Sequence, residues 1–247
     1  MEFYNDDNEN RINEINIPKS ELNSVNVLYD ACKSTVKIII KVGLKVEMAS
    51  GFFILLEKNN KPFNCLMTNE HVITKEMIES QKYIEVYYDN QHKKLNIKLD
   101  RAKRCIKEFR YLKLDISIVE ILQEDNVSAD FFLLPNLDYT MGYENFLNKN
   151  IFIPQFPKGG NLNNSIGKIL EINSFLFDFS YSASTEQGSS GSPIFLEGTI
   201  YVIGIHKQGN KTKVKNYGNF IGPFVNVLKN EKVILKKFIQ TENILVN

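Results

Sequence analysis

The sequence predicts an all-β protein with one short helix near each end of the chain. Runs of β-branched and aromatic residues, separated by turn residues, recur from residue 36 to residue 221. Apolar residues at helical spacing occur in the segments 20–33 and 225–247. The 247 residues are enough for a substantial core, and an all-β chain of this size usually forms a single unit.

The first half of the chain is predicted to contain about six strands. Residues 1–19 are polar, and Ser20 is a suitable N-cap for the helix that follows. The spacing of apolar residues changes from helical to alternating at Val36. Strands are then expected over 36–42, 47–57, 63–69, 83–88 and 93–99, and a last strand begins near Asp115.

A connecting segment precedes the second half. Residues 124–150, which include Pro135 and Gly142, carry few strand signals. Further strands are expected over 150–157, 165–170, 175–181, 194–196, 200–206 and 219–221. The final apolar stripe predicts a C-terminal helix that packs on the strands.

Composition limits the partners and cofactors of the protein. The formal net charge is +1 and the pI is near 7.6, so we expect neither a nucleic acid nor a membrane surface as partner. Cys32, Cys65 and Cys105 are odd in number and lack the spacing of a metal or redox pair, which indicates a reducing compartment. The N-terminus has neither the basic region nor the apolar region of a secretion signal, so we expect a cytoplasmic protein. We also expect neither a metal nor an organic cofactor.

The segment Glu186–Pro193 has the composition of a loop that carries a nucleophilic serine. Ser190 lies between Gly188 and Gly191. A serine hydroxyl is a good nucleophile only when a base takes its proton and donors receive the oxyanion. Gly188 can adopt a positive φ, which would align its N–H with that of Ser190 as a two-donor oxyanion hole. A Gly- and Ser-rich octapeptide also fits an ordinary turn. The choice between an ordinary turn and a nucleophile loop therefore depends on other segments of the chain.

Two upstream segments supply the partners that such a serine needs. His71 ends a predicted strand and Asp115 opens the apolar segment 114–119. The chain order is His, Asp, Ser, with spacings of 115 − 71 = 44 and 190 − 115 = 75 residues. Taken singly, these residues fit a surface histidine and a solvated turn acid. Together with Ser190 they indicate a Ser-His-Asp arrangement, with the first two residues on one barrel and the serine on another.

The three segments resemble the signature blocks of the trypsin-like (chymotrypsin-fold) serine peptidases. These blocks are Thr-Asn-Glu-His-Val at 68–72, Asp-Ile-Ser-Ile-Val at 115–119 and Gly-Ser-Ser-Gly-Ser-Pro at 188–193. The similarity covers roughly residues 35 to 228, and the Val-Ile-Gly-Ile-His segment at 202–206 is most similar to the glutamyl endopeptidase branch. The resemblance implies two six-stranded antiparallel β-barrels.

The resemblance also implies how the chain is divided. The expected parts are an N-terminal extension with a short helix over 1–34, a first barrel over 35–124, a connection over 125–149, a second barrel over 150–228 and a C-terminal helix over 229–247. His71 and Asp115 fall on the first barrel and Ser190 falls on the second. The expected site therefore needs both barrels.

The family pattern assigns a role to each residue of the expected site. His71 would be the general base towards Ser190, and Asp115 would fix the tautomer of His71 and stabilise the imidazolium. Ser189 stands where the digestive enzymes have an aspartate that pairs with a newly cut N-terminal amine, so activation by such a cut is not expected. Ser192 is assigned no chemistry.

The resemblance places the pocket for the P1 side chain around Ser184, Thr185 and His206. A hydroxyl and a neutral imidazole can donate hydrogen bonds to a carboxylate or an amide oxygen. Ser184 occupies the place of the trypsin aspartate, so we expect Glu, Asp or Gln at P1 rather than Arg or Lys. The substrate would add as a strand to the backbone of 206–209, which includes Lys207 and Gly209.

The sequence thus predicts an intracellular serine endopeptidase that acts on polypeptides, with two alternatives left open. A protease-shaped module could bind extended peptides by strand addition without cutting them. An enzyme could also be latent until a regulatory partner acts on the N-terminal segment or on the 124–150 connection. The sequence identifies no such partner.

Overall fold

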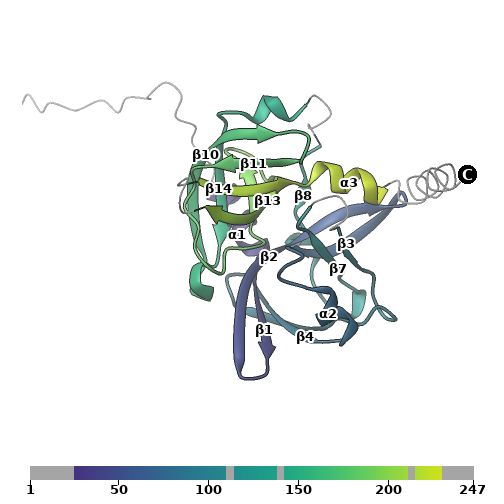
Figure 1. Ribbon diagram of the computed structural model, residues 1–247. Helices are drawn as coiled ribbons and strands as arrows, with labels where there is room; N and C mark the ends of the chain where they lie inside the picture. The colour runs from purple at the N-terminus through teal and green to yellow at the C-terminus, as the bar shows by residue number, and fades with distance from the viewer. Residues whose placement is uncertain (1–24, 110–113, 138–141, 211–214, 230–247) are drawn as a thin grey trace, which may run out of the picture.

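Two β-sheets make up most of the computed structural model, which describes residues 25–109, 114–137, 142–210 and 215–229 (Figure 1). The first sheet has seven strands in the order β5-β4-β1-β2-β3-β7-β6. They are β1 (Thr35–Val42), β2 (Lys45–Lys58), β3 (Lys61–Thr68), β4 (Tyr83–Tyr88), β5 (Lys93–Lys98), β6 (Ile106–Glu108) and β7 (Ser117–Glu120). The end strands β5 and β6 do not pair with each other, so this sheet is a curled half-barrel.

The second sheet closes on itself. Its order is β12-β9-β10-β11-β14-β13-β8, and β12 also pairs with β13, which joins the first six of these strands into a barrel. The strands are β8 (Leu134–Pro135), β9 (Asn150–Gln155), β10 (Asn163–Asn173), β11 (Asp178–Tyr181), β12 (Pro193–Leu196), β13 (Tyr201–Asn210) and β14 (Lys215–Phe220). The predicted all-β, chymotrypsin-like fold class is confirmed. The first sheet differs in detail from the expected barrel, because the short β6 adds a strand and the edges stay apart.

Strand β2 takes part in two hydrophobic cores, because alternate side chains of a strand face opposite ways. Phe53 packs inside the first sheet. Phe52 and Ile54 point the other way, into a cluster between the two sheets. All three side chains are fully buried. Strand β2 therefore ties the packing of the first sheet to the packing between the sheets.

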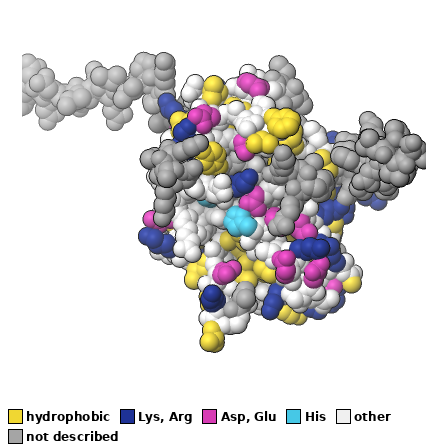
Figure 2. Space-filling view, in the orientation of Figure 1, with side chains coloured by type: hydrophobic (Ala, Val, Ile, Leu, Met, Phe, Trp, Pro, Cys, Tyr) yellow, Lys and Arg dark blue, Asp and Glu magenta, His cyan; other side chains and the backbone are white. Residues whose placement is uncertain are grey.

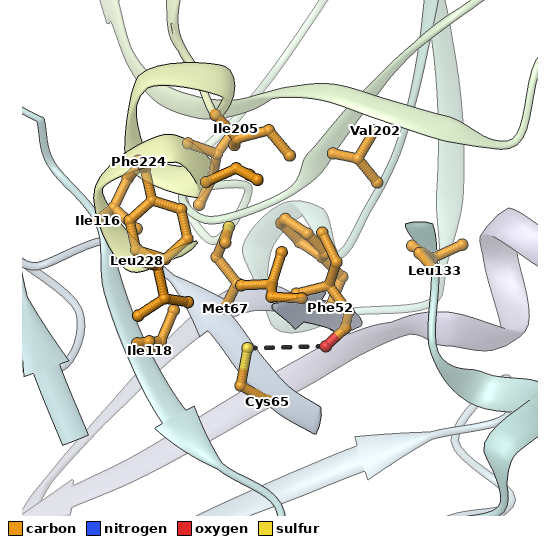
Figure 3. Packing of buried hydrophobic residues seen from close by; sticks show 14 of the residues in the cluster. Phe52, Cys65, Met67, Ile116, Ile118, Leu133, Val202, Ile205, Phe224 and Leu228 are labelled. Carbon is orange, nitrogen blue, oxygen red and sulfur yellow. Dashed lines mark hydrogen bonds between the residues drawn. The ribbon is translucent and has the colours of Figure 1, made fainter. Parts of the chain in front are cut away.

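The cluster between the sheets, here called the inter-sheet core, fixes the two sheets relative to each other. Figure 3 shows Phe52 and Met67 of the first sheet near Val202 and Ile205 of the second, with side chains of helix α3 (Gly222–Lys229) at one side. The rings of Phe109 and Phe224 meet edge to face with centroids 4.5 Å apart. Loops that leave the two sheets at this boundary are consequently held at a defined separation.

The helices lie outside the sheets. Helix α1 (Val25–Ser34) agrees with the predicted N-terminal helix, although the expected N-cap, Ser20, lies outside the described residues. Helix α3 starts at Gly222, before the expected start at 229, and residues 230–247 are outside the described part. A short helix, α2 (Lys75–Glu79), follows β3. Among the described helices, none has the length and apolar character to span a membrane.

The connection between the sheets is built mainly from single helical turns, η2 (Gln123–Asp125), η3 (Ala129–Phe131) and η5 (Tyr143–Phe146). Leu133 anchors it to β2, because its N–H donates to Phe53 O at 3.0 Å and its carbonyl accepts from Leu55 N at 2.9 Å. Near its start, the buried ion pair of Arg104 and Asp125 has an N–O distance of 2.8 Å. Few strand signals were expected here, and the two-residue β8 is consistent with that expectation.

Replacement of Leu228 tests whether α3 contributes to the inter-sheet core. Leu228 is 1% exposed, so Leu228→Ala should lower the free energy of unfolding by about 2–5 kcal/mol through lost burial and a residual cavity. Leu137, which is 57% exposed, provides the matched control, and Leu137→Ala should change stability by no more than about 0.5 kcal/mol. Urea unfolding measures both, and equal effects would contradict this packing of α3.

Candidate active site

A histidine and a carboxylate meet at the boundary between the sheets. Thr68 at the end of β3 pairs with Ser117 at the start of β7, so the residues after β3 and before β7 leave the first sheet side by side. His71 Nδ1 lies 2.6 Å from Asp115 Oδ2, and the His71 backbone N–H donates to Oδ1 at 3.1 Å. The carboxylate therefore orients the ring and favours the proton on Nδ1, which leaves Nε2 as the acceptor.

The surroundings keep the Asp115 carboxylate ionised. Burial acts to raise the pKa of Asp115, but hydrogen bonds and charge from His71 outweigh it, so the pKa is lowered overall. Lys207 contributes further to this lowering through its charge. The Asp115 side chain is 15% exposed and that of His71 is 47% exposed, so the histidine faces solvent while its partner is enclosed. Figure 2 shows an exposed histidine ring near the middle of this face.

Two buried asparagines hold the backbone of Asp115 from opposite sheets. Asn69, next to the end of β3, donates from Nδ2 to Asp115 O at 2.7 Å. Asn219 of β14 accepts the Asp115 N–H at its Oδ1, at 3.2 Å. Both side chains are fully buried, and Asn69 Oδ1 and Asn219 Nδ2 have no partner among the described residues. Asp115 is thus fixed by both sheets at once.

The serine loop is attached to the first sheet through Ser50 of β2. Ser50 N donates to the carbonyl of Ser190 at 2.9 Å, and its hydroxyl donates to the carbonyl of Gly188 at 2.8 Å. The same hydroxyl accepts from Phe156 N at 3.1 Å. Within the loop, the Ser189 hydroxyl accepts the N–H of Glu186 at 3.2 Å. The hydroxyls of Ser50 and Ser189 and the N–H of Ser50 therefore hold the loop. Residue 189 is a serine, so no carboxylate takes part at that position.

The two glycines of the loop are required by conformation and by space. Gly188 has a φ of +92° and Gly191 a φ of +89°, both in the region that favours glycine. A Cβ at Gly188 would lie 2.7 Å from Phe156 O, and one at Gly191 would lie 2.1 Å from Ser50 O. Neither contact is tolerable, so another residue at 188 would push the loop away from Phe156, and one at 191 would push it away from Ser50 of the first sheet.

The backbone of the loop presents two N–H groups. The carbonyl of Gln187 accepts a hydrogen bond from the Lys158 N–H. Because the C=O and N–H of a trans peptide point in opposite directions, the Gly188 N–H is directed away from Lys158. Among the described residues, neither Gly188 N–H nor Ser190 N–H finds an acceptor. Two adjacent unpaired donors can receive a negatively charged oxygen.

A cleft of about 1010 Å³ brings most of the expected site residues together. His71, Asp115 and Ser190 line it at one end. The remaining expected residues that line it are Ser184, Thr185, His206, Lys207 and Gly209. Gly188 lies instead in an adjoining cleft that also includes His71 and Ser190. The two clefts therefore meet at the histidine and the serine.

His206 is an uncharged group in the wall of the larger cleft. It is 3% exposed, and burial lowers its pKa to about 4, although a hydrogen bond with the Tyr217 backbone acts in the opposite direction. The Tyr181 hydroxyl bonds to His206 Nδ1, and burial raises the pKa of Tyr181 well above its usual value. A protonated phenol can donate to Nδ1 of a neutral imidazole, and in that arrangement the ring proton is on Nε2.

Side-chain amides hold the backbone at Ala183 and Ser184. Gln155 Nε2 donates to Ser184 O and Asn216 Nδ2 donates to Ala183 O, at 2.8 and 2.7 Å. Lys207 makes no ion pair within 4 Å with any described acid. Its charge lowers the pKa of Asp115 and opposes the rise caused by burial of Asp178. The cleft therefore carries a neutral donor in its wall and a cation at its edge.

Several other expectations can be compared with the structure. Ser192, to which no chemistry was assigned, is fully buried. Sequence reasoning missed Ser50 and Asn219. Asn69 stands inside the histidine motif and could have been noticed there. Asn219 lies 104 residues from Asp115 along the chain, and no local pattern marks it.

Solved structures with the same fold include proteases of low sequence identity. The serine endoprotease from Yersinia pestis has a TM-score of 0.62 and 15% identity, covering 85% of this chain and 67% of that chain. The active form of the Rv3671c protease from M. tuberculosis has a TM-score of 0.57 and 17% identity, covering 79% of each chain. The HtrA-type protease AlgW with tripeptide has a TM-score of 0.60 and 13% identity, covering 83% of this chain and 62% of that chain. At this identity the likeness concerns the fold.

The family assignment comes from the sequence comparison. A search of curated proteins found no match. The family model of the trypsin-like peptidase domain matches residues 49–205, which is more than half of the chain and includes both the histidine and the serine segments. With the chymotrypsin-like fold, this match places the chain in the trypsin-like peptidase domain family, as a serine endopeptidase.

Proposed function

We propose that the enzyme cleaves peptide bonds through a triad of Ser190, His71 and Asp115, with an acyl-enzyme intermediate. The observation that carries this proposal is the pair of hydrogen bonds that His71 donates to the Asp115 carboxylate, in the cleft that Ser190 also lines. A histidine fixed with its proton on Nδ1 presents Nε2 as a base to a nearby hydroxyl. The binding-module alternative gives no reason for this arrangement.

The proposed reaction has two stages. Ser190 Oγ attacks the scissile carbonyl while His71 Nε2 takes the hydroxyl proton, and the negative charge on the carbonyl oxygen is received by the N–H groups of Gly188 and Ser190. The imidazolium, stabilised by Asp115, then gives its proton to the leaving amine as the C–N bond breaks. A water molecule, deprotonated by His71, releases the acid product and restores Ser190.

The loop geometry supports activity without a newly cut N-terminal amine. In this proposal, the hydroxyl and N–H of Ser50 hold Gly188 and Ser190, and the Ser189 hydroxyl accepts the N–H of Glu186 at the start of the loop. Hydroxyl groups do this without a buried ion pair. A requirement for a processed terminus is therefore absent from the proposed mechanism.

The proposed substrate has Glu, Asp or Gln at P1. A neutral imidazole at His206 and the hydroxyl of Thr185 suit a carboxylate or amide oxygen as partner, and a P1 side chain without such an oxygen would not pair with them. Lys207 adds a cation at the same cleft. Membership of the glutamyl endopeptidase branch stays a prediction. The cytoplasmic location also stays a prediction, supported by three free cysteines.

Removal of the nucleophile tests the proposed mechanism. Ser190→Ala should lower kcat for a peptide substrate by roughly a million-fold, because the hydroxyl is the reacting group. Ser192→Ala is the matched control, since this neighbouring hydroxyl is buried and has no described partner. Steady-state kinetics with circular dichroism to check folding gives the comparison. A dead Ser192→Ala enzyme beside an active Ser190→Ala enzyme would refute the assignment.

Replacement of Asn219 tests whether the hold on Asp115 matters for catalysis. Asn219→Ala should lower kcat by roughly 10- to 100-fold with little change in KM, because a small displacement of Asp115 misaligns His71. Asn150→Ala is the matched control, as this asparagine bonds to Glu197 at 2.6 Å and is absent from the lining of the cleft. A rise in KM alone, or equal losses in both variants, would count against a positioning role.

Peptide-library profiling tests the proposed specificity. The wild-type enzyme should enrich Glu, Asp or Gln at P1, and the enrichment should disappear in His206→Ala. Because His206 is buried, Tyr181→Phe provides a milder change that removes only the hydroxyl on Nδ1 and should weaken the enrichment. Enrichment of Arg, Lys or large apolar residues at P1 in the wild-type enzyme would refute this specificity.

A further inference from the structure

The second, smaller cleft of about 420 Å³ continues the catalytic cleft on the other side of the serine. His71, Ser190 and Gln187 line both clefts. The larger cleft extends from them towards Thr185 and His206, whereas the smaller cleft extends towards Gly188 and the hairpin of β1 and β2. A chain that passes over Ser190 therefore has cleft on both sides of its scissile bond.

The wall of the smaller cleft carries exposed apolar side chains from the hairpin. Val46 and Met48 are two residues apart in β2, so their side chains lie on the same face of the hairpin. They are 52% and 40% exposed. Single exposed apolar residues are ordinary, but two neighbours beside a reacting group indicate contact with a ligand. The hairpin of β1 and β2 projects at the bottom of Figure 1.

Met48 is held in place by the neighbouring loop. A Cβ on Gly159 would lie 1.9 Å from Met48 Sδ, so the methionine occupies the space that a side chain at 159 would need. Gly159 belongs to η6 (Pro157–Gly159), and its φ of +65° also favours glycine. The apolar wall is thus packed against backbone before any ligand binds.

The charged groups nearby do not favour a charged ligand. Lys158, which lines the smaller cleft, is 3.3 Å from a carboxylate oxygen of Glu186, and both side chains are more than half exposed. Glu47 also lines the smaller cleft and is exposed, but its side chain leaves β2 on the face opposite to Val46 and Met48. The two exposed apolar side chains therefore share one face of β2 that Glu47 does not occupy, and Lys158 already has a carboxylate partner.

We propose that the smaller cleft binds the leaving-group side of the substrate and selects an apolar side chain of the Leu, Ile, Met or Phe class. This inference rests on the proposed function, which puts the acyl side of the substrate in the larger cleft. A strand advances about 3.3 Å per residue, so the selected side chain belongs to the first or second residue after the scissile bond. Cleavage then depends on a polar residue before the bond and an apolar residue shortly after it.

The test uses peptides with one common acyl side and either Leu or Ser at the first or second position after the scissile bond. Discrimination in an apolar pocket predicts a kcat/KM ratio, Leu over Ser, of roughly 10 or more at one of these positions. Met48→Asp should bring that ratio close to one, and Met48→Leu should retain it. Leu137→Asp, a change at an exposed leucine away from both clefts, should leave it unaltered. The ratio is taken within each enzyme, so differences in folded protein cancel.

An ester with the same acyl side and no residue after the scissile bond separates the two claims. Failure of wild-type enzyme to hydrolyse this ester and the peptides would overturn the proposed function and this inference with it. Hydrolysis of the ester with a wild-type Leu-to-Ser ratio near one at both positions would overturn this inference alone. A further outcome is a wild-type Leu-to-Ser ratio near one together with a change in the molecular mass of the particle in solution on Met48→Asp. In that case the hairpin is a contact between copies of this chain, and the inference is also overturned.

Discussion

The double hydrogen bond between Asp115 and His71 is the constraint on which the rest of the site depends. It sets the ring orientation and the tautomer, and so decides whether Nε2 is available as a base. The carboxylate can do this only if the backbone at Asp115 is fixed. Asn69 fixes it from the first sheet and Asn219 fixes it from the second. The inter-sheet core holds the two sheets in a fixed position relative to each other. Packing remote from the site therefore determines its geometry.

This arrangement has a cost in stability. Asn69 Oδ1 and Asn219 Nδ2 are buried without a described partner, and a buried unpaired polar atom costs about 1–3 kcal/mol. Apolar residues of similar size would avoid that cost but would leave the N–H and C=O of Asp115 without these bonds. Local violations of good packing of this kind are expected where function requires them. The positive φ angles of Gly188 and Gly191 have the same explanation, since they let the serine loop approach Phe156 and Ser50.

Sequence reasoning succeeded where a local pattern has one structural cause. Alternating β-branched residues predicted β1, β4 and β5 within one or two residues, because each strand buries one face. The short glycine-flanked serine segment and the histidine motif were also recognisable locally. Ser50 and Asn219 were not, because their importance comes from partners more than 100 residues away. The three-residue β6 is too short to show a period, which is why the first sheet was expected to have one strand fewer.

The central claim is that the Asp115 and His71 pair activates Ser190. The most direct measurement is reaction of the folded protein with a fluorophosphonate, followed by peptide mass spectrometry, because this reagent forms a stable bond with an activated serine in a single step. The account predicts one adduct, on Ser190, that forms far more slowly in Asp115→Asn, in which the wrong tautomer of His71 is favoured. A folded protein that gains no adduct, or that is modified on Ser192, would contradict it.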